Sequence, residues 1–377
     1  MKVYFDNAAT TAIHPEVLEV MLPIMQKQFG NPSSIHAYGR EARSIIENAR
    51  KTVARLLNAA PSEIFFTSGG TEANNTAIRC SLNDLGIKHA ISSKIEHHAV
   101  EHTLHEACKK NAIKLSYVNI DHKGNIDLAH LEDLLKANEK SLVSLMHANN
   151  ELGTLSPVER VGELCRKYDA VFHSDTVQTM GHYPHDVKKI SADFITCAAH
   201  KFHGPKGVGF LYINSRVKIN PFITGGAQER NMRGGTENIY GIAGLAKALE
   251  IAYRDMEHDR KTISALRNYM IQKLKSEIPD ISFNSETEKE CLYTVLNVSF
   301  PPSDFSEMLL FNLDIAGIAA SGGSACSSGS NVGSHVLAGI GADPNRPAVR
   351  FSFCRYNTIE EVDYVVEKLK ELYAVKV

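Results

Sequence analysis

Short apolar stretches alternate with amphipathic helical patterns over the first 255 residues, and this alternation limits the fold more than any other feature of the chain. Helical periodicity covers residues 16–28 and 40–57. Strand patterns occupy residues 63–67, 89–92, 141–146, 170–173 and 194–196. Because parallel strands need crossover connections, the order strand, helix, strand predicts a mostly parallel mixed sheet flanked by helices. The predicted fold class is therefore α/β.

The pattern changes after about residue 255. A long charged helix is predicted over residues 257–278, followed by strands over 295–300 and 349–353. These elements predict a smaller α+β domain that the N-terminal arm joins. The large domain is expected to span residues 15–255, and the small one residues 1–14 and 256–377. A chain of 377 residues, 43% of them hydrophobic, can form two substantial cores.

Composition excludes several classes of protein. The formal net charge of −2 gives no basic excess that would indicate a nucleic-acid partner. No segment approaches the roughly 18 uninterrupted apolar residues of a membrane helix, and the N-terminus does not resemble a signal peptide. Seven cysteines, irregularly spaced and without a Cys-x-x-Cys pair, fit neither a disulfide framework nor a zinc ribbon. We expect a cytoplasmic protein with reduced thiols and no bound metal.

Two polar residues in the large domain suggest a cofactor. Asp175 follows the strand pattern at 170–173, and Lys201 follows the one at 194–196. Pyridoxal phosphate needs a lysine amine that forms a Schiff base with its aldehyde, and a carboxylate that keeps its pyridine nitrogen protonated. Lys201 and Asp175 can fill these roles. The alternative is that Lys201 is a surface cation in a turn and that Asp175 caps the following helix.

Cys326 has an unusual sequence environment. It stands among the small, turn-forming residues of Ala320-Ser-Gly-Gly-Ser-Ala-Cys-Ser-Ser-Gly-Ser330, whereas Cys80, Cys165 and Cys291 have apolar neighbours in periodic segments. Structural cysteines usually have apolar neighbours in periodic segments, whereas reactive cysteines stand on accessible segments. We therefore interpret Cys326 as a nucleophile on a loop.

Together these segments resemble the cysteine desulfurases, a branch of the class V aminotransferase-like, fold-type I pyridoxal phosphate enzymes. The likeness runs nearly end to end. Besides the segments around Asp175, Lys201 and Cys326, it includes residues 4–11, 30–34, 67–74, 96–100, 149–153, 233–236 and 349–352. The resemblance implies a transferase of this fold type with pyridoxal 5'-phosphate as its cofactor.

The phosphate of such a cofactor needs an anion site. Gly70 and Thr71 leave a strand pattern and open a helix, where backbone amides and a hydroxyl suit an anion. A plain helix cap after a glycine turn is the alternative. The resemblance implies that the phosphate lies at Thr71, that His200 is a further phosphate ligand, and that Thr236 reaches the phosphate from a second subunit. A homodimer with shared active sites follows from that last role.

The resemblance also assigns residues around the cofactor ring. His97 is expected to stack on the ring and to shuttle protons. Asn150 and Gln178 are expected to hydrogen-bond around the ring hydroxyl, and Asp175 to pair with the ring nitrogen. These roles rest on matching segments, because most of the 17 histidines in the chain have no argument beyond surface or capping roles.

A substrate amino acid brings a carboxylate, for which arginine offers a bidentate and permanently charged partner. Arg350, in an apolar strand pattern, matches the carboxylate clamp of the resembling enzymes, and Asn31 matches a residue that assists there. Arg350 could instead form a structural ion pair, in which case Arg355 is the competing candidate for the clamp.

The implied reaction converts L-cysteine to L-alanine. Lys201 acts as the base at Cα, and the Cys326 thiolate attacks the substrate sulfur and becomes a persulfide. A free thiol is only a few per cent ionised at neutral pH, so His97 or the substrate amine must activate it. The resemblance implies a flexible catalytic loop that hands sulfur to an acceptor protein, for iron–sulfur cluster assembly, a thio-cofactor or tRNA thiolation.

The chain departs from the family pattern in three places. Ala198 stands where many relatives carry a serine or threonine that binds phosphate, so cofactor affinity is expected to be lower unless Thr196 or a water substitutes. Asn331-Val-Gly-Ser334 replaces the common Leu-Glu-Pro-Ser. The sequence ends some twenty residues after Arg355, short of the tail with which relatives grip an iron–sulfur scaffold. A selenocysteine lyase, or a class V aminotransferase that does not use Cys326, remains an alternative.

Overall fold

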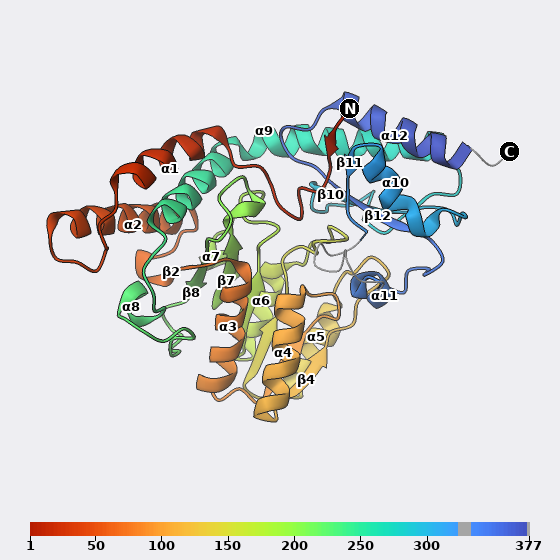
Figure 1. The fold of residues 1–377 in the computed structure, drawn as a ribbon. Coiled ribbons are helices and arrows are strands. Elements are labelled where there is room, and N and C mark those ends of the chain that lie inside the picture. The colour runs from red at the N-terminus through yellow and green to blue at the C-terminus, as the bar shows by residue number, and fades with distance from the viewer. Residues whose placement is uncertain (323–332, 375–377) are drawn as a thin grey trace.

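The computed structural model describes residues 1–322 and 333–374, and Cys326 lies outside them (Figure 1). Its largest sheet has seven strands in the order β2-β8-β7-β6-β5-β3-β4. These are β2 (Ile64–Thr67), β3 (His89–Ser92), β4 (Lys114–Tyr117), β5 (Ser141–Ser144), β6 (Val171–Asp175), β7 (Phe194–Ala198) and β8 (Gly209–Ile213). The neighbouring pairs β4–β3, β3–β5, β5–β6 and β6–β7 are parallel. Strand β8 is antiparallel to both of its neighbours, β2 and β7. The predicted mostly parallel mixed sheet is confirmed.

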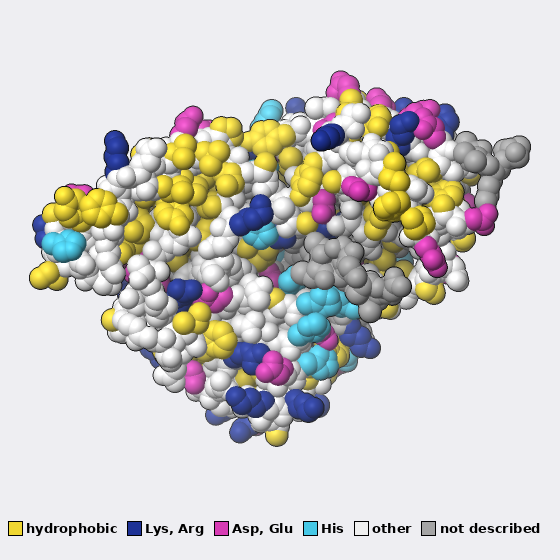
Figure 2. Space-filling view, in the orientation of Figure 1, with side chains coloured by type: hydrophobic (Ala, Val, Ile, Leu, Met, Phe, Trp, Pro, Cys, Tyr) yellow, Lys and Arg dark blue, Asp and Glu magenta, His cyan; other side chains and the backbone are white. Residues whose placement is uncertain are grey.

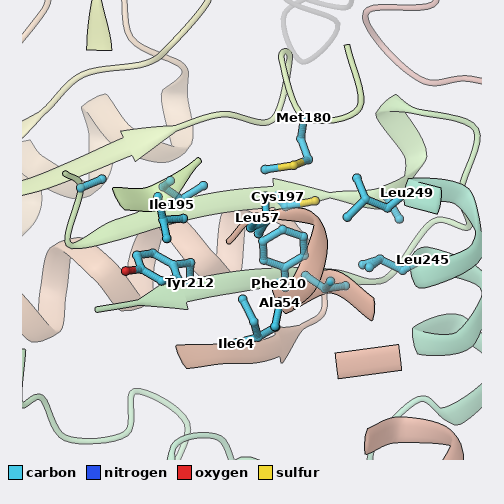
Figure 3. Close-up of a cluster of buried hydrophobic side chains, with 14 of the residues drawn as sticks. Ala54, Leu57, Ile64, Met180, Ile195, Cys197, Phe210, Tyr212, Leu245 and Leu249 are labelled. Carbon is cyan, nitrogen blue, oxygen red and sulfur yellow. The ribbon is translucent and has the colours of Figure 1, made fainter. Parts of the chain in front are cut away.

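Helices cover both faces of this sheet. One face carries α3 (Gly70–Asp84) and α4 (His98–Asn111); the other carries α2 (Ala37–Leu56), α5 (Leu128–Lys136), α6 (Val158–Lys167) and part of α9 (Ile239–Glu277). Both faces need covering because successive side chains of a strand point to opposite faces of the sheet, as strand β7 shows. Phe194 packs against α3, whereas Ile195 and Cys197 enter the core that α2 and α9 close (Figure 3). No described helix is long and apolar enough for a membrane crossing.

A single 39-residue helix, α9, runs along both cores of the molecule (Figure 1). Its first half buries Leu245 and Leu249 against the large sheet, and its second half buries Met270 and Leu274 in a second hydrophobic core. The helix predicted to start at residue 257 therefore begins 18 residues earlier, at Ile239. Its first half is buried on most sides, so its sequence has no polar stripe from which helical periodicity could be recognised.

The second core lies around a small antiparallel sheet with the order β12-β10-β9. Its elements are β9 (Ser282–Phe283), β10 (Val295–Ser299), β12 (Ala348–Ser352), α10 (Leu309–Ile315) and α12 (Ile359–Ala374). The N-terminal arm joins it: β1 (Val3–Tyr4) pairs with β11 (Ile318–Ala319), and Phe5 packs 5.0 Å from Phe353 between ring centroids. The two cores thus share α9, and the arm belongs to the second.

The remaining elements connect these layers. They are α1 (Pro15–Lys27), α7 (Val187–Ile190), α8 (Gln228–Asn231), α11 (His335–Gly339) and the 3₁₀ turns η1 (Pro61–Glu63), η2 (Ala199–Lys201) and η3 (Ser306–Met308). Strand β6 extends two residues beyond its predicted end, to Asp175, which pairs with Thr196 of β7. Because β6 and β7 are parallel, Asp175 and the turn after β7 lie at the same edge of the sheet, where open α/β sheets place their ligands.

Candidate active site

A cavity of about 240 Å³ lies at the carboxyl-terminal edge of the parallel strands. Loops after four strands, the start of α3, the N-terminal arm and strand β12 all contribute to its walls. The structure brings most of the predicted site residues together here: Gly70, Thr71, His97, Asn150, Asp175, Gln178, His200, Lys201 and Arg350.

Lys201 enters the cavity from the 3₁₀ turn η2, directly after β7. Its Nζ donates hydrogen bonds to the backbone oxygens of Ala8 at 2.6 Å and Ala9 at 2.8 Å. Gln178 Nε2 also donates to the oxygen of Ala8, at 3.0 Å. The N-terminal arm is therefore part of the site, since its carbonyl groups orient the lysine amine and the glutamine amide.

Asp175 is held by a chain of buried hydrogen bonds. Its Oδ2 accepts from Asn74 Nδ2 at 2.6 Å, and its Oδ1 accepts from the backbone N–H of Val177 at 3.0 Å. Since the amide nitrogen of Asn74 faces Asp175, its oxygen accepts from His173 Nε2 at 3.1 Å, and His173 Nδ1 accepts from Ser144 Oγ at 2.8 Å. Burial lowers the pKa of His173 to about 4, which keeps its ring neutral and this chain directional.

His97 is the N-cap of α4, and its Nδ1 accepts a hydrogen bond from the backbone N–H of Ala99 at 3.1 Å. Burial lowers the pKa of His97, while nearby Asp175 opposes that shift and Lys201 adds to it. The neutral ring therefore carries its proton on Nε2, because Nδ1 must stay unprotonated to accept. In this form His97 is a hydrogen-bond donor to its surroundings.

The start of α3 has the backbone geometry that an anion site requires. Gly69 has φ +152°, a conformation that glycine adopts readily, and a Cβ on Gly70 would lie 2.8 Å from a methyl of Val177. Two glycines thus let the backbone turn from β2 into α3 and present its first amides. A pocket next to the main cavity shares Gly70, Thr71 and His200 with it and adds Lys206, a cation that sequence reasoning passed over. Burial, with Lys201 and Lys206, lowers the pKa of His200 to about 4.

The donor and acceptor groups of the cavity fit pyridoxal phosphate. A lysine amine, a buried carboxylate and the first residues of α3 line it, and Lys206 lines the pocket next to it. Asn150 also lines the cavity, and its Oδ1 is buried and has no hydrogen-bond partner among the described residues. A buried amide oxygen without a partner costs free energy, and a hydroxyl bound beside it would satisfy it.

Arg350 reaches the cavity from the centre of β12, although its side chain is only 1% exposed. Its NH2 group donates to Asp6 Oδ1 at 2.7 Å, and its NH1 group donates to the backbone oxygen of Asn150 at 3.0 Å. Arg350 thus makes an ion pair and also lines the cavity, so the two interpretations of this residue are compatible. Arg355 pairs with Asp255 and Asp259 and does not line the cavity.

Three predicted residues lie elsewhere or outside the described chain. Asn31 is exposed in the loop between α1 and α2, where its Oδ1 accepts from the N–H of Ser33, and it does not line the cavity. Thr236 is exposed and lines a separate pocket of about 160 Å³. In one chain the structure does not bring these two residues to the other site residues. Cys326 is not among the described residues.

The flanks of the segment that contains Cys326 are nevertheless anchored at the cavity. On one side, Ser321 exchanges backbone hydrogen bonds with Arg350, and its Oγ donates to Asp6 Oδ1 at 3.0 Å. On the other side, Ser334 Oγ donates to Glu151 Oε2 at 2.5 Å, next to Asn150. Both flanks are therefore held beside residues that line the cavity.

Sequence reasoning missed Asn74, Asp6 and Lys206. Asp6 and Asn74 lie inside segments that carried the family resemblance, yet no motif marked them as partners of Arg350 and Asp175. Residues 344 positions apart come together only when the arm crosses to β12. The sequence also left open whether Thr196 replaces the phosphate ligand that is missing at Ala198. Its buried hydroxyl lies 3.1 Å from His173 Nε2, so it does not serve the phosphate.

Fold and cavity together define a pyridoxal-phosphate-dependent enzyme of α/β architecture. The aminotransferase class-V family model matches residues 3–365. The chain is 43% identical to "Cysteine desulfurase IscS" of Dictyoglomus turgidum, covering 98% of this chain and 94% of that protein. A relative of the same name from Methanosarcina thermophila is also 43% identical, covering 98% and 91%.

Solved structures agree with these relatives. A "NifS-like protein" superposes with a TM-score of 0.91 at 38% identity over 100% of both chains. The structure titled "SspA in complex with cysteine" superposes with a TM-score of 0.82 at 32% identity, covering 95% of this chain and 100% of that one. This chain belongs to the cysteine desulfurase family of class-V aminotransferases.

Proposed function

We propose that this enzyme converts L-cysteine to L-alanine and carries the released sulfur as a persulfide on Cys326. The convergence of Lys201, Asp175 and Arg350 in one cavity is the observation that supports this proposal most directly. A lysine and a carboxylate suit the cofactor, and an arginine suits an amino-acid carboxylate. The relative whose structure is titled "SspA in complex with cysteine" binds cysteine, which supports a substrate of this kind.

The cofactor roles follow from the chemistry of each side chain. Pyridoxal phosphate, when bound, supplies an electron-accepting ring to the substrate amine. In the proposal, Lys201 holds the cofactor and removes the Cα proton, and Asp175 accepts the hydrogen bond of the ring nitrogen. Asn150 and Gln178 bind near the ring hydroxyl. Gly70, Thr71 and His200 bind the phosphate at the start of α3.

Sulfur transfer is proposed to occur between two sulfur atoms. The Cys326 thiolate attacks the substrate sulfur, a sulfur–sulfur bond forms, and the Cβ–sulfur bond breaks. The electron pair of that bond stays on Cβ, which takes up a proton and becomes the methyl group of L-alanine. One thiol and one cysteine thus give one persulfide and one alanine, and no external oxidant is needed.

Cys326 must lose its proton before it attacks. Neutral His97 carries its proton on Nε2, because its Nδ1 accepts from the N–H of Ala99. It is therefore suited to donate a hydrogen bond from Nε2, and its Nδ1 is not free to remove a proton. We propose that the substrate amine deprotonates the thiol, and that the two protons taken up by Lys201 and by the amine are the ones returned to Cα and Cβ, with His97 as a hydrogen-bond donor beside them.

A homodimer is proposed to complete the site. Large apolar side chains are exposed on α1 and the following loop and helix, where Figure 2 shows a wide hydrophobic area: Leu18, Leu22, Met25, Phe29, Ile35 and Tyr38. Burying such an area between two chains would be favourable. Asn31 lies in this same region, so its role beside Arg350, like that of Thr236 at the phosphate, requires the second chain. Light scattering should give twice the chain mass, and Ile35→Asp should lower it.

The sulfur acceptor is proposed to be a protein thiol of the iron–sulfur cluster or thiolation machinery, in the cytoplasm, where thiols stay reduced. A selenocysteine lyase would share this cofactor cavity. Comparing turnover of L-cysteine and L-selenocysteine by the same preparation separates the two activities. A class V aminotransferase would release no sulfide and would not depend on Cys326.

The proposal is tested by alanine and sulfide release from L-cysteine in the presence of added thiol. The native enzyme, Cys326→Ala and Cys80→Ala are compared with the cofactor bound. Cys80 is a suitable control because it is buried, and burial raises its pKa to about 12. We expect Cys326→Ala to lose both products and Cys80→Ala to keep them. Alanine release that persists in Cys326→Ala would disprove the persulfide role.

A further inference from the structure

A histidine-rich cluster lies on α4 outside the cofactor cavity. His98, Glu101 and His102 follow one another at helical positions i, i+3 and i+4, so they share one face of the helix. Each offers one ligand atom, and these three atoms all lie within 4.8 Å of one another. None of the three residues lines the cofactor cavity.

A second observation marks this cluster as more than a solvated helix face. The Nδ1 atom of His98 is buried and has no hydrogen-bond partner within residues 1–322 and 333–374. The ring of His335, from α11, lies 4.3 Å from the ring of His98 between centroids, and that of His102 lies 4.6 Å from it. Figure 2 shows histidine side chains gathered on this face of the molecule.

The carboxylate of the cluster is already oriented toward the imidazoles. Glu101 Oε2 lies 3.2 Å from His102 Nε2, and its Oε1 lies 3.1 Å from His105 Nε2. Tyr117 contacts the same nitrogen of His105 at 2.6 Å, which fixes that ring from the other side. Glu101 is the only one of these side chains that carries a formal negative charge. It would therefore neutralise part of the charge of a metal ion bound in the cluster.

Two imidazoles and one carboxylate are ligands of a borderline cation such as Zn²⁺, whereas Mg²⁺ and Ca²⁺ prefer sets of oxygen atoms. Bonds of about 2.0–2.1 Å place neighbouring ligand atoms of a tetrahedral zinc about 3.3 Å apart. The ligand atoms of the cluster lie at most 4.8 Å apart, so each pair must move closer by roughly 1.5 Å at most to bind such an ion. The exposed side chain of His102 can make that movement by rotation about its own bonds.

We propose that His98, Glu101 and His102 form a binding site for a divalent transition-metal ion of the Zn²⁺ class, with a fourth coordination position open. His335 Nε2 donates to the backbone oxygen of Glu96 at 2.9 Å, so this ring acts as a neighbour that positions His98. The site lies one residue from His97, which lines the cofactor cavity. The site does not depend on the proposed reaction, because none of its ligands takes part in it.

Zinc binding to the purified, cofactor-loaded protein tests this site. Zn²⁺ is titrated in competition with a metal-sensitive dye, first on the native chain and then on Cys326→Ser, which removes a competing thiol ligand. In the Cys326→Ser background, His98→Ala and His102→Ala remove one ligand each, and His122→Ala removes an exposed histidine that belongs to no such cluster. Circular dichroism checks that each variant keeps its helices.

We expect one equivalent of Zn²⁺ per chain in the native and Cys326→Ser proteins. Affinity should fall at least tenfold in His102→Ala and in His98→Ala, and stay within twofold in His122→Ala. Loss of binding in Cys326→Ser alone would assign the metal to that thiol and overturn the proposal. Unchanged affinity in both ligand variants, or no stoichiometric binding at all, would overturn it as well. These outcomes are independent of cysteine turnover.

Discussion

Asp6 and Arg350, 344 residues apart, form an ion pair of 2.7 Å at the wall of the cofactor cavity. Asp6 Oδ1 also accepts from Ser321 Oγ at 3.0 Å, on the flank of the segment that contains Cys326. The N-terminal arm thus fixes the guanidinium of the proposed substrate clamp and touches the proposed nucleophile's segment. Since Arg350 is almost completely buried, the pair also affects the stability of the second core.

Replacing Asp6 should destabilise the protein. Asp6→Ala leaves a buried guanidinium without its anion, and removing one partner of a buried pair costs about 3 kcal/mol or more. Asp6→Asn keeps an oxygen that accepts the hydrogen bond, so it should cost less. Urea unfolding of the three proteins measures the difference. Equal midpoints for Asp6→Ala and the native protein would contradict the importance of this pair.

Replacing Arg350 should weaken substrate binding more than cofactor binding. Arg350→Ala removes charge-assisted hydrogen bonds to the substrate carboxylate, each worth about 1.5–3 kcal/mol, so KM for L-cysteine should rise about tenfold or more. Arg355→Ala is the matched control. It removes an arginine that pairs with Asp255 outside the cavity and should leave KM unchanged while lowering stability. If KM rises in the control instead, Arg355 is the clamp.

Replacing Lys201 should remove the visible absorbance of the bound cofactor. Lys201→Ala deletes the amine that Ala8 and Ala9 orient, so no covalent link to the cofactor aldehyde can form. Lys206→Ala is a useful comparison, because Lys206 lines the pocket of the proposed phosphate site and its loss should weaken affinity without changing the absorbance maximum. Unaltered spectra for Lys201→Ala would refute the assignment of the cofactor lysine.

Adding a hydroxyl at position 198 should strengthen cofactor binding. Ala198 lines the cavity, and the hydroxyl of Thr196 is engaged with His173 and does not compensate. A new hydrogen bond to a phosphate is worth about 1.5–3 kcal/mol, so Ala198→Ser should lower the cofactor Kd about tenfold. Ala198→Val adds volume without a donor and should not lower it. Equilibrium titration of the cofactor into the apoenzyme measures all three affinities.

Stability should fall in mild acid because several histidines are buried in the neutral state. Burial lowers the pKa of His173 to about 4, below the ordinary value of 6.5. A lowered pKa in the folded state gives stability that is complete above pH 6.5 and is lost as pH falls toward 4, since the unfolded chain then binds the proton. A shift of this size corresponds to about 3 kcal/mol for one residue.

His173→Gln should therefore flatten the dependence of unfolding free energy on pH between 6.5 and 4. His122→Gln changes an exposed ring and should leave the slope as it is in the native protein. Urea unfolding at a series of pH values provides the comparison. A slope that is the same in His173→Gln and the native protein would mean that His173 does not contribute to acid sensitivity.

Much of the fold could be predicted because its strands are short apolar runs between turns. The strand at His89–Ser92 was predicted with its observed bounds, and β2, β5 and β7 differ by one or two residues at their ends. The start of α9 could not be predicted, since residues such as Leu245 and Ala246 lie in a core where no face needs to be polar. Periodicity marks amphipathic helices, and a buried helix has none.

The sequence by itself determined the fold class and singled out Lys201 and Asp175 as candidate cofactor residues, because strand and helix periods and reactive residue types are local properties. Only the tertiary structure decided which groups hold them. Asn74 reaches Asp175, and Asp6 reaches Arg350, through contacts between segments 101 and 344 residues apart. Hydrogen bonds of this kind require the donor and acceptor to be placed to within a few tenths of an ångström, which no local pattern specifies.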